Sequence, residues 1–246
     1  MNIIALIPAR MGSTRFPGKP LATILGKPMI HHVYSNVSKC KLLTKVVVAT
    51  CDQEIYDYIH NIGGDAIMTK NSHERASDRC AEALLKLEAI NKIKYDIAVM
   101  VQGDEPMVHP EMITEAVTPM IKNEKIKVIN LLGEIKSKEE FSDKNCIKVV
   151  CDKNNNALYF SRQPIPTLPK KDKMKKQVCI IPFKRDFLIE YTSLSPTSYE
   201  ESESIDMLRI LENGQSIKMV PTKYESFAVD TPSDLTKVEK LMQKIN

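Results

Sequence analysis

A short segment near the N-terminus concentrates residue types that bind phosphate. Between residues 10 and 19 it contains three cations, two hydroxyls and two glycines: Arg10, Arg15, Lys19, Ser13, Thr14, Gly12 and Gly18. Cations, hydroxyls and exposed backbone N–H groups together suit a polyphosphate. The spacing matches neither G-x-x-x-x-G-K-S/T nor G-x-G-x-x-G, the two common phosphate-binding motifs. The segment is therefore either a phosphate site of different design or a solvated basic loop.

Two carboxylates follow short apolar segments later in the chain. Asp104 lies in Gln-Gly-Asp-Glu-Pro at 102–106, and Asp230 lies in Ala-Val-Asp-Thr-Pro at 228–232. Mg²⁺ prefers a few carboxylates together with phosphate oxygens and water. One Mg²⁺ could bridge Asp104, Asp230 and a nucleotide α-phosphate. The β- and γ-phosphates would then bind the basic segment (residues 10–19) and leave as pyrophosphate. Each carboxylate also has a local interpretation, Asp104 as a turn residue before proline and Asp230 as part of a helix start.

The segment His73–Arg79 and the amide of Gln102 are further candidates. Gln102 can read either a base edge or a hydroxyl. Residues 73–79 could contact a ribose or base, with Arg79 on an anion. The alternative is a capping segment in which Ser77 or Asp78 accepts from first-turn amides of a helix.

The second half of the chain offers weaker candidates. Arg162 ends a Tyr-Phe-Ser-Arg sequence and could pair with an acceptor carboxylate, although a lone arginine is more often a surface residue. A lysine-rich run at 170–176 is interpreted as a solvated loop that could also attract anionic substrates. The remaining histidines show no metal-ligand spacing and are interpreted as structural: His31, His32, His60 and His109.

Alternating strands and helices should position the first group of candidates. Ile3–Ile7 predicts a buried strand that Pro8 ends, because proline cannot donate to a ladder. Further strands are predicted over residues 45–50, 66–68 and 96–101. Helices are predicted over residues 29–37, 52–62 (with Asp52 as N-cap), 77–87 and from 110. This alternation over residues 1–120 predicts an α/β fold with a doubly wound, mostly parallel sheet, and such sheets bind ligands at the carboxyl ends of their strands.

The remainder of the chain predicts a smaller region of mixed α+β structure. Strands are predicted over residues 127–132, 146–151, 157–160 and 217–220. Helices are predicted over residues 185–192 and 198–212, and a final helix is predicted to be capped by Thr231 or Ser233. Residues 164–177, rich in proline and lysine, predict a loop.

Composition excludes several classes of protein. The 246 residues are 43% hydrophobic and 27% charged, which is ordinary for a globular protein. The net charge of +4 is too small to argue for nucleic acid binding. We find neither an apolar run of membrane-spanning length nor a signal peptide, and the six scattered cysteines predict reduced thiols. We therefore expect a cytoplasmic protein.

Five motifs in order along the chain are similar to one known family. They are Ile-Pro-Ala-Arg-Met-Gly-Ser-Thr-Arg-Phe-Pro-Gly-Lys-Pro-Leu at 7–21, Val-Gln-Gly-Asp-Glu-Pro at 101–106, Ala-Leu-Tyr-Phe-Ser-Arg at 157–162, Met-Leu-Arg-Ile-Leu-Glu-Asn-Gly at 207–214 and Val-Asp-Thr-Pro-Ser-Asp-Leu at 229–235. Together they resemble the 3-deoxy-manno-octulosonate (Kdo) cytidylyltransferase, or CMP-Kdo synthetase, family. The resemblance implies a nucleotide-diphospho-sugar-transferase-like fold and a homodimer. It also implies Mg²⁺-dependent transfer of CMP from CTP to a sugar acid with release of pyrophosphate.

The resemblance and the residue types together predict a complete site. Nucleotide contacts are expected from Pro8, Ala9, Arg10, Ser13, Arg15, Lys19, Ser77, Arg79 and Gln102. Acceptor contacts are expected from Gln102, Arg162, Gln177 and Glu203. Mg²⁺ is expected on Asp104 and Asp230, and these two residues with Lys19 are the expected catalytic groups. The chain is predicted to form one domain, with a nucleotide-binding part (1–125), an acceptor-binding and dimerisation part (126–225) and a returning metal-site segment with the C-terminal helix (226–246).

Two segments depart from the family pattern. At 73–79, Arg75 and Ala76 replace a small hydroxyl residue and a glycine; at 177–183, Gln177 and Ile181 replace a histidine and a tyrosine. Because lost hydrogen-bonding groups change specificity strongly, a different acidic acceptor, such as an amino-Kdo or another sugar acid, is the alternative. A non-catalytic nucleotide-binding relative is disfavoured, since a protein that only binds nucleotide needs no second metal carboxylate.

Overall fold

The computed structural model describes residues 1–13, 15–167 and 174–245. Thr14 of the basic segment and residues 170–173 of the lysine-rich run lie outside the described residues. The chain divides into two compact units, the first formed by residues 1–114 and 226–246 and the second by residues 115–225. The first break falls eleven residues before the expected boundary at 125/126 (125 − 114 = 11), whereas the second coincides with 225/226. The interpretation of these parts as one domain stays a prediction.

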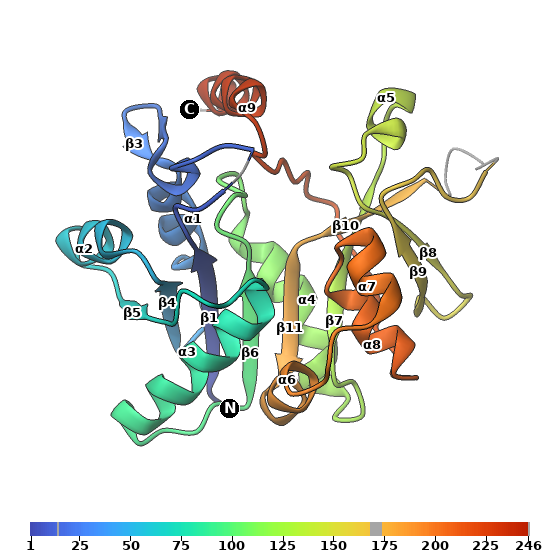
Figure 1. The fold of residues 1–246 in the computed structure, drawn as a ribbon, viewed down its shortest axis with the longest axis horizontal. Coiled ribbons are helices and arrows are strands. Elements are labelled where there is room, and N and C mark those ends of the chain that lie inside the picture. The colour runs from blue at the N-terminus through green and yellow to red at the C-terminus, as the bar shows by residue number, and fades with distance from the viewer. Residues whose placement is uncertain (14, 168–173, 246) are drawn as a thin grey trace. The chain divides into compact units, whose positions relative to one another are not determined.

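The first unit contains four parallel strands in the order β6-β1-β4-β5. Their bounds are β1 Ile3–Ala9, β4 Lys45–Thr50, β5 Ala66–Met68 and β6 Ile97–Val101. Every residue of β1 and of β6 is buried, as the continuous apolar runs predict for central parallel strands. The doubly wound, mostly parallel α/β fold is therefore confirmed (Figure 1).

Helices connect these strands and pack on them. They are α1 Met29–Val37, α2 Gln53–Asn61, α3 Ala76–Asn91 and α4 Pro110–Lys122, with η1 Lys19–Leu21 and the hairpin strands β2 Thr23–Ile24 and β3 Lys27–Pro28 preceding α1. Both α1 and α3 contact β1. α4 begins in the first unit and continues into the second.

Two local predictions in this unit were wrong. β1 does not end before Pro8, because Pro8 and Ala9 still pair with Ala49 and Thr50 of β4. Pairing with β6 stops at Leu6, so beyond that residue the ladder continues on one side only and a missing donor costs little. Asp52 precedes α2 as expected, but its side chain caps no α2 amide and instead accepts the N–H of Met11 at 2.8 Å.

The C-terminal helix α9, Pro232–Ile245, belongs to the first unit and has its own small core. Buried Val229 and Val238 pack in one cluster with Ile24 and Met29, next to Phe16 of the basic segment. Thr231 Oγ1 accepts the N–H of Asp234, which confirms Thr231 as the cap. The segment bearing Asp230 is thus packed against the elements that follow the basic segment.

The second unit contains a five-stranded mixed sheet in the order β12-β7-β10-β8-β9. Its strands are β7 Ile129–Glu134, β8 Lys148–Cys151, β9 Ala157–Ser161, β10 Lys175–Val178 and β12 Lys218–Pro221. β12 pairs with β7 in parallel, and the other pairs are antiparallel. β11 Ile180–Lys184 contacts β7, and the helices are α5 Lys138–Ser142, α6 Arg185–Thr192, α7 Ser198–Glu203 and α8 Met207–Glu212.

The helix predicted over residues 198–212 is two helices, α7 and α8. Ser204 between them has φ 52°, a left-handed conformation that a continuous α-helix cannot contain. β10 was not predicted, since the segment 164–177 was interpreted as a loop, and no element was predicted where β11 lies. The polar strand β10 forms because β7 and β8 provide pairing partners on its two sides.

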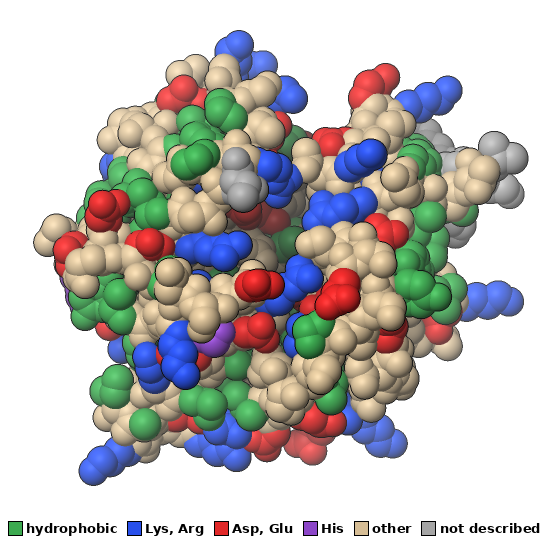
Figure 2. Space-filling view, viewed as in Figure 1, with side chains coloured by type: hydrophobic (Ala, Val, Ile, Leu, Met, Phe, Trp, Pro, Cys, Tyr) green, Lys and Arg blue, Asp and Glu red, His purple; other side chains and the backbone are tan. Residues whose placement is uncertain are grey.

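Acidic and basic side chains are mixed on the face drawn in Figure 2, in keeping with a net charge of only +4. Among the described residues, no helix is both long enough and apolar enough to cross a membrane.

Candidate active site

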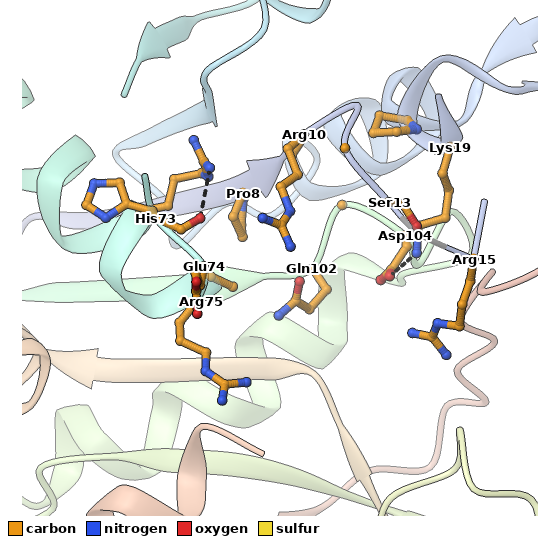
Figure 3. Close-up of a pocket in the computed structure, with 16 residues that line it drawn as sticks. Pro8, Arg10, Ser13, Arg15, Lys19, His73, Glu74, Arg75, Gln102 and Asp104 are labelled. Atoms are coloured by element: carbon orange, nitrogen blue, oxygen red, sulfur yellow. Dashed lines mark hydrogen bonds and ion pairs between the residues drawn. The ribbon is translucent and has the colours of Figure 1, made fainter. Parts of the chain in front are cut away.

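A pocket of about 320 Å³ lies in the first unit (Figure 3). Its walls come from three segments: residues 8–20 after the start of β1, residues 73–79 at the start of α3, and residues 102–104 after β6. These segments follow the carboxyl ends of two adjacent parallel strands or open a helix, which is where α/β sheets bind ligands. Most of the residues expected to contact a nucleotide line this pocket.

The basic segment is folded by bonds to its own backbone and to Asp52. The carbonyl of Met11 accepts the N–H groups of Ser13 at 2.9 Å and Gly18 at 3.1 Å, which closes the loop. Gly18 has φ 71°, a conformation that favours glycine. The Asp52 carboxylate holds the N–H of Met11, so a residue outside the segment fixes where the loop begins.

Lys19, Asp104 and Asp230 meet at one side of the site, as their expected shared role requires. The Lys19 ammonium lies 2.6 Å from Asp104 Oδ2 and 3.6 Å from Asp230 Oδ1. Arg15 Nη2 lies 2.9 Å from the same oxygen of Asp230. The side chains of the two aspartates are 26% and 16% exposed, so they are accessible to a ligand. Figure 3 draws the Lys19–Asp104 contact as a dashed line.

The backbone joins the two carboxylate segments directly. The N–H of Val229 donates to the carbonyl of Asp104 at 2.9 Å, which places Asp230 beside the strand end after β6. Gly103, just before Asp104, has no room for a side chain, because a Cβ there would lie 2.8 Å from the carbonyl oxygen of Pro8. Only glycine allows the ends of β1 and β6 to approach this closely.

The two carboxylates have the chemistry of ligands for a divalent cation. Oxygens of Asp104 and Asp230 converge on one cationic atom, the Lys19 ammonium, so their geometry already suits a shared positive charge. No group of three or more His, Cys, Asp or Glu side chains that could hold a metal occurs within the described residues. Two carboxylates completed by phosphate oxygens and water are the ligands that Mg²⁺ prefers, so the residues fit this metal.

Arg10 and Gln102 occupy the middle of the pocket. Both side chains point into it in Figure 3. Arg10 is exposed at the end of β1, and Gln102 is half-buried directly after β6. The Arg10 guanidinium can therefore contact a phosphate while the Gln102 amide contacts a neutral polar group of the same ligand. Arg75 and Ala76, two of the residues that depart from the family pattern, also line the pocket.

Arg79 has its guanidinium bonded to the protein in this structure. Its side chain is 2% exposed, and it donates to Thr69 Oγ1 at 2.6 Å and to the carbonyls of Lys70 at 3.3 Å and His73 at 3.4 Å. Ser77 is fully buried at the same helix start. The side chain at the N-cap position of α3 belongs to Arg75 and caps no amide. Arg79 thus fixes the segment before α3 as well as lining the pocket.

Glu82 holds the same segment from the next turn of α3. Its carboxylate accepts the N–H of Lys70 at 3.0 Å, forms an ion pair with Lys86 at 2.7 Å and contacts His73 Nε2. Burial alone would raise the pKa of Glu82, but hydrogen bonds from Lys86, Lys70 and His73 lower it to about 2. Sequence reasoning missed Glu82, although its position three residues after Arg79 puts both on one helical face.

Apart from Gln102, the expected acceptor residues lie in the second unit, where the structure brings Arg162 and Glu203 together. The Glu203 carboxylate accepts Ser161 Oγ at 2.7 Å and the N–H of Arg162 at 2.8 Å, and Arg162 Nε donates to the Glu203 carbonyl at 2.7 Å. Gln177, on β10, instead donates to Asn130 Oδ1 at 2.6 Å. Sequence reasoning missed Asn130, because nothing local marks a fully buried amide on an apolar strand.

Comparisons with known proteins identify the family of the chain. A family model for cytidylyltransferases matches residues 4–217. The chain is 44% identical to a 3-deoxy-manno-octulosonate cytidylyltransferase of Trichlorobacter lovleyi over 99% of this chain and 100% of the relative. It is 40% identical to the protein of the same name from Fusobacterium nucleatum, over 100% and 99% of the two chains.

Solved structures show the same relationship. CMP:2-keto-3-deoxy-manno-octonic acid synthetase complexed with CTP matches with a TM-score of 0.89 and 36% identity, covering 100% of both chains. 4-Diphosphocytidyl-2C-methyl-D-erythritol synthase from Anaerococcus prevotii shares the fold at a TM-score of 0.67 and 15% identity, over 98% and 96% of the two chains. The chain therefore belongs to the cytidylyltransferase family, among the 3-deoxy-manno-octulosonate cytidylyltransferases, and is a nucleotidyltransferase.

Proposed function

We propose that this enzyme transfers CMP from CTP to the anomeric hydroxyl of 3-deoxy-manno-octulosonate and releases pyrophosphate. The observation that carries the proposal is the meeting of Lys19, Asp104 and Asp230 beside the pocket at the ends of β1 and β6. The name of the full-length relatives and the CTP in the related solved structure support the nucleotide and the acceptor. The reaction is an activation step for the synthesis of lipopolysaccharide or another surface glycan.

The cations of the basic segment would bind the triphosphate. Arg10 lines the pocket, and Arg15 and Lys19 reach Asp230 from the same loop. As the acceptor hydroxyl oxygen attacks the α-phosphorus, a new P–O bond forms and the bond to the bridging oxygen of pyrophosphate breaks. Negative charge then moves onto pyrophosphate, where fixed cations stabilise it. The hydroxyl proton leaves with the attack, to solvent or to an adjacent carboxylate.

Asp104 and Asp230 are the residues that would hold Mg²⁺. When bound, the ion would offset negative charge on the phosphates and on the leaving pyrophosphate. Gln102, in the middle of the pocket, is proposed to contact both the nucleotide and the acceptor. Ser13 and the backbone at Pro8 are proposed to complete the nucleotide contacts, together with the remaining expected residues: Ala9, Ser77 and Arg79.

Arg162 is proposed to bind the acceptor carboxylate. Three of its guanidinium donors are bonded to backbone carbonyls, at Glu203, Ser204 and Lys144, so its orientation is fixed. A guanidinium has further N–H donors that a carboxylate can accept from in pairs. Glu203, whose carboxylate holds the Arg162 N–H, is the second proposed acceptor residue.

A different acidic acceptor is the second candidate, and it has a specific basis. Gln177 is bonded to Asn130, and Ile181 is 2% exposed, so two positions where the family carries polar side chains present fewer hydrogen-bonding groups here. An amino-Kdo or another sugar acid would fit a site with altered polar contacts. We also propose that the enzyme is a homodimer. A cytoplasmic location is proposed as well, in keeping with six free thiols.

The proposal is tested by supplying purified protein with CTP, Mg²⁺ and a panel of acidic acceptors. Pyrophosphate release and a CMP-sugar product with Kdo are the expected result. Turnover with another sugar acid but not with Kdo would move the assignment to the second candidate. Absence of turnover with every acceptor, while CTP still binds, would overturn the enzymatic assignment of the site.

A further inference from the structure

Lys148, on β8, is a fully buried lysine outside the pocket. Its ammonium donates to three backbone carbonyls, those of Asp143 at 2.7 Å, Cys146 at 2.7 Å and Arg162 at 2.5 Å. An ammonium has three N–H donors, so each is used. Burial lowers the pKa of the Lys148 ammonium below its ordinary value. Burying a charge is costly unless hydrogen bonds compensate it, and these three bonds use every donor of the Lys148 ammonium.

The three carbonyls belong to two separate stretches of chain. Asp143 and Cys146 lie between α5 and β8, whereas Arg162 follows the end of β9. Lys148 therefore ties the connection before its own strand to the residue after the neighbouring strand. The antiparallel pairing of Lys148 with Ser161 brings the ammonium within reach of the Arg162 carbonyl.

The side chain of Arg162 returns to the same stretch. Its Nη1 donates to the carbonyl of Lys144, between the two carbonyls that Lys148 holds, and its Nε and Nη2 donate to the carbonyls of Glu203 and Ser204. The Glu203 carboxylate in turn accepts the Arg162 N–H. The ammonium and the guanidinium thus form one network that joins residues 143–146, the end of β9 and the end of α7.

We propose that Lys148 is a positioning residue for the acceptor, acting through the backbone of Arg162. This inference rests on the proposed function, in which Arg162 and Glu203 bind the sugar acid. Bidentate recognition of a carboxylate tolerates little displacement of the guanidinium. Removing the ammonium leaves the carbonyls of Arg162, Asp143 and Cys146 without their shared donor, so the Arg162 backbone loses one of the bonds that hold it.

The test compares Lys148→Met, which keeps length and removes the charge, with the wild-type enzyme. We expect the KM for Kdo to rise roughly tenfold or more, because charge-assisted hydrogen bonds that fix Arg162 are lost. The Kd for CTP should change by less than about twofold, since the pocket is formed by other residues. Leu188→Ala, in the buried face of α6, is the control for lost stability without loss of this network.

Several results would overturn the inference. An unchanged KM for Kdo in Lys148→Met would do so. So would a rise in the KM for Kdo that is matched by the Kd for CTP, if Leu188→Ala gives the same changes at a similar loss of melting temperature. If Lys148→Met does not fold, Lys148→Gln, which retains amide donors, is measured by the same criteria. If the wild-type enzyme does not use Kdo, the proposed function fails by itself. Hydrogen exchange at the Arg162 amide then still tests Lys148, and an exchange rate unaltered in the variant overturns its positioning role.

Discussion

Replacement of Asp230 by Asn is the sharpest test of the site. The change removes one negative charge and keeps the shape of the side chain. Asp230 Oδ1 lies 2.9 Å from Arg15 Nη2 and 3.6 Å from the Lys19 ammonium. Arg15 is 50% exposed, so its ion pair with Asp230 is screened by solvent. We therefore expect the free energy of unfolding to fall by about 1 kcal/mol or less.

Turnover should respond far more than stability does. Asp104 and Asp230 are the two carboxylates proposed for Mg²⁺, so the variant loses half of the metal's protein ligands. Removal of one group that stabilises transition-state charge typically lowers kcat by about 10²–10³-fold. We expect a decrease of that order and a higher Mg²⁺ concentration for half-maximal rate. The Kd for CTP should change by less than about tenfold, because the cations of the loop are retained.

Pyrophosphate release measured against Mg²⁺ concentration, together with calorimetric titration of CTP, separates these effects. Asp65→Asn is the matched control, because Asp65 is an ion-paired aspartate of the same unit, 3.2 Å from Lys45 and outside the pocket. It should leave kcat and the Mg²⁺ dependence unchanged. A kcat of Asp230→Asn within a few-fold of wild type would falsify the metal assignment.

Three further predictions concern single side chains. Lys19→Ala should raise the Kd for CTP by roughly tenfold or more, because a charge-assisted bond to phosphate is lost, and an unaltered calorimetric Kd would mean that the loop binds no triphosphate. Glu200→Gln should lower the free energy of unfolding, measured in urea, by about 3–5 kcal/mol. Glu200 is 0% exposed and both its carboxylate oxygens lie 2.6 Å from Arg209 nitrogens, so the variant buries the Arg209 charge without its carboxylate. A loss below about 1 kcal/mol would contradict this. The lowered pKa of Glu82 gives the native state stability that is present above pH 4.5 and is lost as pH falls from 4.5 toward about 2. Melting temperatures of Glu82→Gln and wild type should therefore converge over that range, and a constant difference would argue against the shift.

The sequence predicts the parallel sheet well because each of its strands carries a local signal. β1, β4 and β6 are continuous apolar or β-branched runs, and such runs fit strands buried on both faces. Pro8 shows the limit of that reasoning. The rule that proline ends a strand assumes that the strand is paired on both sides. The pairing of β1 with β6 ends at Leu6, before Pro8, and only the register of the folded sheet reveals this.

The second unit is less predictable because its structure depends on partners distant in sequence. β10 reads Lys-Lys-Gln-Val, without apolar alternation, and becomes a strand through pairing with Glu134–Leu131 and Lys148. The break between α7 and α8 has a comparable origin. Ser204 is left-handed there, and the side chain before it, Glu203, is held by Ser161 and Arg162. These bonds form across forty or more residues of chain, and no local pattern indicates them.

The same distinction applies to the site. Lys19 and Asp104 are recognisable because each lies near the end of a strong strand, at the edge of the sheet where ligands bind. The residues that hold the site in place carry no such mark. Asp52 resembles a helix cap but serves the basic segment, and Lys148 resembles an ordinary surface lysine of a strand but is fully buried.

Asp230 lies at a helix start and is also a proposed metal ligand, and the two interpretations do not compete. The sequence Asp-Thr-Pro reads as a helix start, and α9 does begin there, but Thr231 and Asp234 do the capping through their mutual hydrogen bonds. The carboxylate of Asp230 is left to face Lys19 and Arg15. Packing of Val229 and α9 in a cluster that includes Phe16 keeps that carboxylate beside the basic segment. A helix start becomes part of the site because tertiary packing, which no local sequence encodes, brings it to the end of the sheet.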